Sequence, residues 1–404
     1  MNPFFERTRR PLLILACAVA LVAIALRIKT RHFDSSSSPP IVAANKLNSD
    51  ESAVALSHAP SNTAAASSVK AKPIVEENLD QALRSALNLL RTQQNPENSR
   101  AVLASLRERL TRPGSEAEGV AAIRRFLDSG EDATTALAFR VGPSHTLAEA
   151  PTLRTALLDW LGQLDHAAAA EYSGLVFQTM SSPEEYAMAL RNFAQGRPTQ
   201  REELRSHFER LRTHVPWASR PTAGYLEAFD VVPYLAEPSF IEPLASLLSP
   251  SSPTPLRHAS LVALDRLVIA NPLAALTEVI GAHALDDQPQ TRASFLARAD
   301  VRDPGQRQAV ERYLSSSSLS DSELDYFVTL FPNVNRFVSP NLLTDSGMQS
   351  LPEIAAMDAA ALARVRAWQT EPQFRRWQPQ LERLAKRLQE HVESASRGGY
   401  SPRR

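Results

Sequence analysis

Two stretches of the chain share one apolar pattern, and this repetition constrains the fold more than any other feature. PTLRTALLDWLGQLD begins at Pro151, and TPLRHASLVALDRLV begins at Thr254. The matching apolar positions are Leu153, Ala156, Leu158, Leu161 and Leu164 in the first copy and Leu256, Ala259, Leu261, Leu264 and Leu267 in the second. Such spacing places one apolar stripe along a helix. In both copies an Arg follows the first Leu, and we expect it on the solvent side of the stripe.

From Glu76 onward the chain predicts one helix after another, separated by Pro, Gly and Asp. The segment EGVAAIRRFLDSG, for example, ends at Gly130, a typical helix C-terminus. No alternating apolar pattern predicts strands between the helices. Residues 332–347, PNVNRFVSPNLLTDSG, contain too much Pro and Asn for a long helix. The sequence therefore predicts an all-α fold.

The stripe LR-x-A-x-L-x-x-L, found at residues 153–161 and 256–264, resembles that of HEAT-like helical repeats. This resemblance implies an elongated array of antiparallel helical pairs, an α-solenoid, because one pair alone cannot bury its apolar face. The two copies lie more than two standard repeats apart, so the units between them must be irregular. A non-repetitive helical bundle is the alternative.

An uncharged stretch lies near the N-terminus. Residues 11–26, PLLILACAVALVAIAL, approach the length needed to cross a bilayer, and basic side chains flank them. We expect residues 1–33 to form an uncleaved membrane anchor. One alternative is a cleaved signal peptide, although no small-x-small site follows at the proper distance. The other is a lipoprotein modified at Cys17, although Leu15 is too large for that motif.

The remaining chain divides by composition. Residues 34–74 are rich in Ser, Ala and Pro, which predicts a disordered stalk. We expect a helical-repeat body at residues 75–303, a C-terminal helical region at residues 304–395 and a disordered tail at residues 396–404. A stalk behind a single anchor usually holds a domain outside the cytoplasm. We therefore expect a single-pass inner-membrane protein whose bulk is periplasmic or otherwise extracytoplasmic.

Charge and cysteine usage exclude several classes of protein. The formal net charge is zero, but six basic side chains and one acidic side chain give the first 33 residues a charge of +5. The rest of the chain is therefore acidic, which argues against nucleic-acid binding. Cys17 is the single cysteine, so neither an internal disulfide nor a thiolate metal cluster can form. The expected partners are the lipid bilayer, through residues 11–26, and another protein.

Candidate catalytic and metal-binding residues fail on spacing. Glu203, His207 and His214 share one helical face, but the two histidines are two turns apart. Asp286 and Asp287 are adjacent in a turn, where acids cap the next helix more often than they catalyse. Neither a Gly-x-Ser-x-Gly elbow nor a phosphate-binding glycine loop occurs. We therefore expect no catalytic residue, no metal site and no cofactor.

The stretch ARVRAWQTEPQFRRWQ, residues 363–378, combines aromatic rings with arginines, a composition typical of protein-binding hot spots. The candidate partner-binding residues are Arg364, Arg366, Trp368, Phe374, Arg375, Arg376 and Trp377. The alternative is that both tryptophans belong to the core of a terminal helical pair, with the arginines on its solvated faces.

These patterns favour a non-catalytic scaffold of a bacterial envelope that binds a protein on a curved helical surface. The alternative is a helical-fold enzyme of the envelope, acting for example on cell-wall glycan, with an active site that no motif identifies. Polar residues converging in a deep pocket would favour the enzyme, and a broad groove would favour the scaffold.

If residues 11–26 are an uncleaved anchor, protease added after the outer envelope is opened should degrade residues 75–395. The inner membrane would then shield little more than the anchor itself. Immunoblotting for a C-terminal epitope measures the loss, and a cytoplasmic protein in the same cells controls for lysis. Full protection of the epitope would place the body in the cytoplasm.

Overall fold

A computed structural model of the chain describes residues 78–397, all within one unit that covers Ile74–Arg404. Most of the described residues are helical, so the predicted all-α class is confirmed. The expected anchor, residues 1–33, and the expected stalk, residues 34–74, lie outside the described residues. Among the helices of residues 78–397, none is both long enough and apolar enough to span a bilayer.

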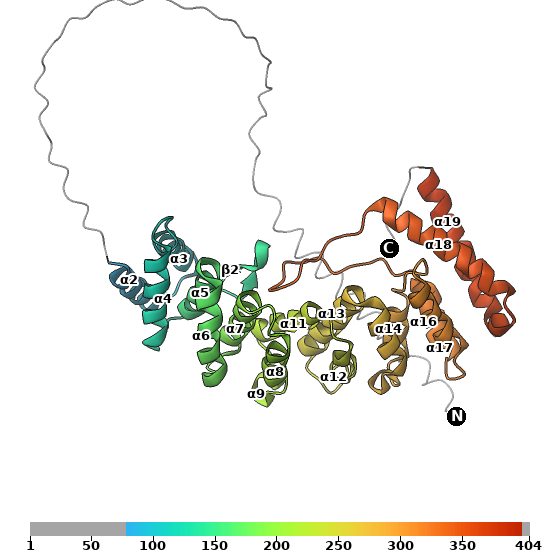
Figure 1. The fold of residues 1–404 in the computed structure, drawn as a ribbon, viewed down its shortest axis with the longest axis horizontal. Helices are drawn as coiled ribbons and strands as arrows, with labels where there is room; N and C mark the ends of the chain where they lie inside the picture. Colours follow the sequence, from blue (N-terminus) through green and yellow to red (C-terminus); the bar gives the residue numbers. More distant parts are fainter. Residues whose placement is uncertain (1–77, 398–404) are drawn as a thin grey trace, which may run out of the picture. The chain divides into compact units, whose positions relative to one another are not determined.

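Figure 1 shows how the described elements follow one another along the chain. The elements before the second copy of the stripe are α2 (Leu79–Thr92), α3 (Pro96–Leu110), α4 (Glu116–Asp128), β1 (Arg140–Val141), η2 (Pro143–His145), β2 (Leu147–Glu149), α5 (Leu153–Leu164), α6 (His166–Thr179), α7 (Pro183–Gly196), α8 (Arg201–Arg212), α9 (Val215–Ser219), α10 (Ala223–Glu227), η3 (Ala228–Asp230), α11 (Val231–Leu235), η4 (Pro238–Phe240) and α12 (Ile241–Ser246). The later elements are α13 (Thr254–Ala270), α14 (Pro272–Gly281), η5 (His283–Leu285), α15 (Pro289–Leu296), α16 (Pro304–Ser315), α17 (Asp321–Leu330), α18 (Leu351–Thr370), η6 (Pro372–Trp377) and α19 (Gln378–Ser396).

The helix boundaries follow capping chemistry that is visible in the sequence. Asn78 accepts a hydrogen bond from the Asp80 backbone N–H and so caps α2. Ser350 and Glu353 form a reciprocal capping box at the start of α18. Gly130 adopts a positive φ of 71° just after α4, a conformation that favours glycine.

Most of the repeated stripe lies on the buried faces of α5 and α13, whereas Leu164, Ala259 and Leu261 are only partly buried. Leu153 and Leu161 in α5, and Leu256 and Leu264 in α13, are at most 2% exposed. α5 packs against α4, α6 and α7, while α13 packs against α11, α12 and α14. Helices that are close in sequence thus bury the stripe from both sides. In addition, α14 packs on α16, across the predicted boundary between the helical-repeat body and the C-terminal helical region at residue 304.

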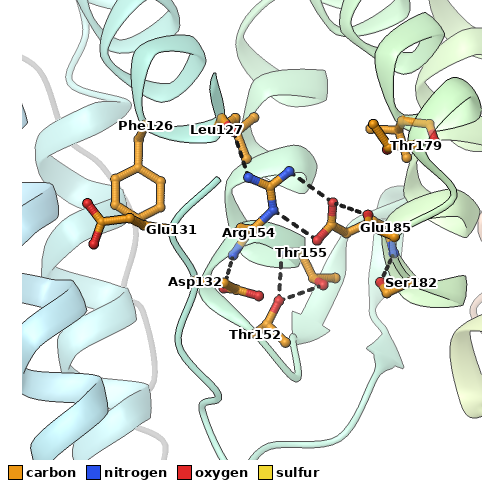
Figure 2. A network of polar contacts seen from close by, with 12 residues as sticks. Phe126, Leu127, Glu131, Asp132, Thr152, Arg154, Thr155, Thr179, Ser182 and Glu185 are labelled. Carbon is orange, nitrogen blue, oxygen red and sulfur yellow. Dashed lines mark hydrogen bonds and ion pairs between the residues drawn. The ribbon is translucent and has the colours of Figure 1, made fainter. Parts of the chain in front are cut away.

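The solvent position expected for the arginine after the first Leu is wrong for α5. The side chain of Arg154 is only 13% exposed and makes a bidentate ion pair with Glu185 of α7, with N–O distances of 2.9 and 3.1 Å. It also donates to the Leu127 carbonyl oxygen at the end of α4 (2.6 Å), as Figure 2 shows. The ends of α4 and α7 cover this side of α5, so Arg154 joins three helices.

Two short strands correct the expectation of a chain without strands. β1 and β2 pair antiparallel, with Arg140 opposite Glu149 and Val141 opposite Leu147. Strands of two and three residues are too short to show an alternating pattern, so periodicity could not reveal them. The turn between them contains Gly142 and Pro143, which are typical turn residues.

Residues 332–350, which we call the strap, contain no helix, as their Pro and Asn content predicted. The strap connects α17 to α18. In Figure 1 it runs from α17 back past α13 toward the β hairpin and then returns to α18. A long extended segment therefore lies against helices that precede it by about a hundred residues, and the Leu343 backbone N–H donates to Asp230 of η3.

Replacing a stripe leucine should destabilise the fold. Leu161→Ala and Leu264→Ala should each lower the free energy of unfolding by about 2–5 kcal/mol, because both side chains are fully buried. Urea denaturation measures the change. Leu175→Ala is the matched control, since Leu175 is 47% exposed and its loss should matter little. Unchanged stability in both stripe variants would mean that the stripe is not core.

Candidate functional site

The aromatic residues predicted to bind a partner lie inside the protein. Trp368, Phe374 and Trp377 are at most 4% exposed. The indole N–H of Trp368 donates to Glu311 (3.3 Å), and that of Trp377 donates to the Leu314 carbonyl oxygen (2.9 Å). This is the packing that the alternative, a terminal helical core, describes.

The arginines of the same stretch lie nearer the surface but are mostly engaged within the chain. Arg364 bonds to Glu311 and Glu371, and Arg366 donates to Gln389 (2.7 Å). Arg376 donates to the Ser316 carbonyl oxygen and lies over the Trp377 ring, 4.2 Å from its centroid. Arg375 is exposed. Binding of a partner by these arginines stays a prediction.

The histidines considered as metal ligands pack against aromatic rings. His207 stacks on Phe177 with a centroid distance of 3.8 Å, and its Nε2 lies 3.7 Å from a Glu203 carboxylate oxygen. Burial lowers the pKa of His207, which favours the neutral ring. His214 packs instead against Trp217, at 4.3 Å between centroids. No metal-holding group of three His, Cys, Asp or Glu occurs within residues 78–397.

The two acids considered for catalysis lie in an exposed turn. Asp286 pairs with Arg292 and contacts the His283 ring at 3.4 Å. The hydrogen bond from Arg292, followed by that from His283, lowers the pKa of Asp286. Asp287 beside it is exposed. A carboxylate with a lowered pKa is a poor general acid near neutral pH.

A different site is built where the strap meets the helices. Asp230 of η3 is 5% exposed, and one of its carboxylate oxygens accepts the backbone N–H groups of both Leu343 and Thr344, at 2.7 and 2.8 Å. Its other oxygen accepts the Thr344 hydroxyl and lies 3.6 Å from an Arg266 nitrogen. Burial raises the pKa of Asp230, and the donors of the strap act in the opposite direction. One buried carboxylate thus holds the middle of the strap.

The β hairpin provides a second attachment. His145 lies at the end of η2, and its Nδ1 donates to the Asn341 carbonyl oxygen (2.9 Å). Its Nε2 faces Asp345 at 3.6 Å. Asn341 is 2% exposed, and its side chain donates to the Thr344 carbonyl oxygen (2.9 Å), which closes a turn in the strap. The strap therefore contacts both the hairpin and η3 through the same few residues.

The beginning of the strap is fixed by main-chain contacts. The Asn333 N–H donates to the Ala297 carbonyl oxygen (2.7 Å), and Arg298 donates to the Asn333 carbonyl oxygen (3.3 Å). Arg298 is held in turn by a buried ion pair with Asp265 of α13. Further along, Arg266 of α13 donates to the Ser339 hydroxyl (2.9 Å).

A pocket of about 430 Å³ remains between the strap and the helices. Its helical walls are mainly apolar. They come from α10, η3, α11 and α13, and the strap adds Phe337 and Val338. These two strap side chains are 45% and 54% exposed. The His258 ring of α13 meets the Phe337 ring edge-on, with 6.3 Å between centroids. An apolar pocket with a few polar groups is the usual form of a binding site.

Glu227, the last residue of α10, is the polar group of this pocket that the fold leaves without a partner. In the part of the chain that the structure describes, its carboxylate makes neither a hydrogen bond nor an ion pair. Burial, and then the nearby Asp230 carboxylate, raise the pKa of Glu227, while Arg266 acts in the opposite direction. Arg266 pairs with Asp230 and donates to Ser339, while its buried Nε makes no hydrogen bond.

Sequence reasoning missed Glu227, Asp230 and His145 as site residues. None lies in a recognisable motif, and the partners of Asp230 and His145 are far away in the sequence. One signal was available, because a long segment without helix between two helices is uncommon unless it has a function. That signal points to residues 332–347 but not to the residues that bind them.

Removing the carboxylate of Asp230 should release the strap. Asp230→Ala deletes hydrogen bonds to a charged group, which typically contribute about 1.5–3 kcal/mol. The strap should then open more often, so trypsin should cleave after the exposed Arg336 about tenfold faster or more. Mass spectrometry of the timed digest measures the rate, and a melting curve tests for global unfolding. Asp345→Ala is the control, because this side chain is 99% exposed and an exposed pair contributes little. Equal cleavage rates for wild type and Asp230→Ala would mean that Asp230 does not hold the strap.

The chain matches no protein-family profile, no curated protein and no solved structure. Its function must therefore be argued from its own residues.

Proposed function

We propose that this protein is a non-catalytic scaffold of a bacterial envelope that binds a protein partner on its helical region, by which we mean residues 75–395. In this proposal residues 11–26 anchor the chain in the inner membrane, and residues 34–74 hold the helical region off the membrane on its extracytoplasmic side. The helical region is a HEAT-like α-solenoid, which the packing of α5, α13 and their sequence neighbours supports.

One observation carries the proposal: the helical surface already binds an extended chain, its own strap. Asp230 accepts two successive backbone N–H groups of the strap, and His145 and Arg298 donate to its backbone carbonyl oxygens. Contacts to backbone atoms are how protein surfaces bind extended peptides largely irrespective of their sequence. This surface thus holds one extended segment by its backbone, and the partner is proposed to bind beside that segment.

The pocket beside the strap supports the proposal in a second way. Val262 of α13 and Phe229 of η3 give it apolar walls, and Phe337 extends the apolar surface outward. Exposed aromatic side chains next to a pocket are frequent at protein interfaces, where they supply much of the binding energy. The exposed Arg375 is a second place where a partner is proposed to contact the chain.

Photo-crosslinking tests this function directly. A photoreactive amino acid at His258, at the edge of the pocket, should form an adduct with one protein in native membranes, because the proposed partner covers that site. The same probe at exposed Glu97 of α3 is the control. The captured protein is then purified, and its affinity for the full-length chain is measured.

Val262→Arg should weaken that affinity about tenfold or more, because a charged side chain would occupy the pocket. Thr277→Arg, at an exposed position of α14, should leave the affinity unchanged. The proposal fails if the position-258 probe gives no adduct that the position-97 probe lacks, or if Val262→Arg binds the captured protein as tightly as wild type does.

A further inference from the structure

The pocket between α10, α13 and the strap combines an apolar interior with one uncompensated carboxylate. Phe229, Pro233 and Val262 supply apolar wall, and the pocket volume of about 430 Å³ is large enough for a bulky side chain. Phe337 and Val338 continue this apolar surface out of the pocket and are about half exposed. A segment with a leucine-, methionine- or phenylalanine-like side chain would bury apolar area here that the fold leaves in contact with water.

The charges that line the pocket determine whether a positively or a negatively charged ligand would bind more favourably. Asp230 accepts hydrogen bonds from the N–H groups of Leu343 and Thr344 and from the Thr344 hydroxyl. Arg266 is bound to Asp230 (3.6 Å) and to the Ser339 hydroxyl (2.9 Å). Glu227 is left over, so the pocket carries one more negative charge than its own cation compensates, with the His258 ring turned against Phe337.

The position of Glu227 makes this charge costly without a partner. The carboxylate lies on the pocket lining, partly buried and close to a second carboxylate, and both conditions raise its pKa. An anionic ligand would add a third negative charge. A cation placed against Glu227 would replace lost hydration with a charge-assisted hydrogen bond, which is among the strongest polar contacts in proteins.

We propose, building on the proposed function, that this pocket takes a short peptide segment of the partner, in which an apolar side chain enters the pocket and a neighbouring Lys or Arg pairs with Glu227. The strap forms one wall of the site through Phe337, so the site is complete while the strap is docked on Asp230 and His145. The recognised chemistry is therefore an apolar residue next to a basic one, presented in an extended chain.

Peptide selection tests this chemistry. A library of random twelve-residue peptides is selected on the full-length chain in detergent micelles. The enriched sequences should place Lys or Arg within one or two positions of a large apolar residue. The best peptide is then synthesised with a fluorescent label, and its affinity is measured by fluorescence polarisation for wild type and variants.

Glu227→Gln should weaken the best peptide about tenfold, as expected for losing one charge-assisted contact. Replacing the basic residue of the peptide with norleucine should cause the same loss, and combining the two changes should add little, because both remove one interaction. Val262→Arg should abolish binding, whereas Glu278→Gln at an exposed site of α14 should have no effect. Melting curves of the variants separate these effects from unfolding.

Several outcomes overturn the inference and leave the scaffold function intact. Enriched peptides that lack a basic residue, or that bind Glu227→Gln as tightly as wild type, would refute the pairing with Glu227. Peptides that bind Val262→Arg normally would show that the pocket is not their site. Failure to enrich any peptide, together with no adduct from the position-258 probe, would refute the inference and the proposed function alike.

Discussion

A buried ion pair between Asp159 of α5 and Arg191 of α7 organises the central part of the described chain. Both side chains are 1% exposed, and Arg191 also donates to the Asp159 carbonyl oxygen (3.1 Å) and to Asn192 (2.8 Å). Gly162 of α5 makes this approach possible, since a Cβ there would lie 2.3 Å from the Asn192 side-chain oxygen and 2.6 Å from an Arg191 nitrogen. Removing one partner of such a pair leaves a buried charge, which typically destabilises a protein by about 3–5 kcal/mol.

The proposed site depends on this pair through the β hairpin. Asp159 accepts the Leu147 N–H (3.2 Å), and Arg191 donates to the His145 carbonyl oxygen (2.9 Å), so the pair fixes the end of the hairpin turn that leads into β2. The His145 side chain then binds the Asn341 carbonyl oxygen of the strap. A charge pair between two helices thereby positions a segment that follows it by about 150 residues, which links the core to the proposed binding surface.

The sequence predicted those parts of the structure that depend on local pattern. Leucine spacing located the buried faces of α5 and α13, and capping residues located helix ends. The sequence did not predict environments that depend on distant partners. Arg154, for example, was expected in solvent because the sequence could not place α4 and α7, which cover it, beside α5. For the same reason Trp368 and Trp377 could be either hot spot or core from composition alone, and Glu227 had no visible role. The periodicity of apolar residues does not predict which residues contact each other across long sequence separations.

The way in which the strap is fastened leaves its outward side chains unconstrained by folding. The strap is held through its backbone N–H and carbonyl groups, through the Ser339 and Thr344 hydroxyls, and through the buried Leu342. Phe337, Val338 and Met348 make none of these contacts. Yet these three remain 45–84% exposed and apolar, an arrangement that folding alone does not favour. Under the proposed function, a partner covers these apolar side chains, of which Phe337 and Val338 line the pocket beside Glu227.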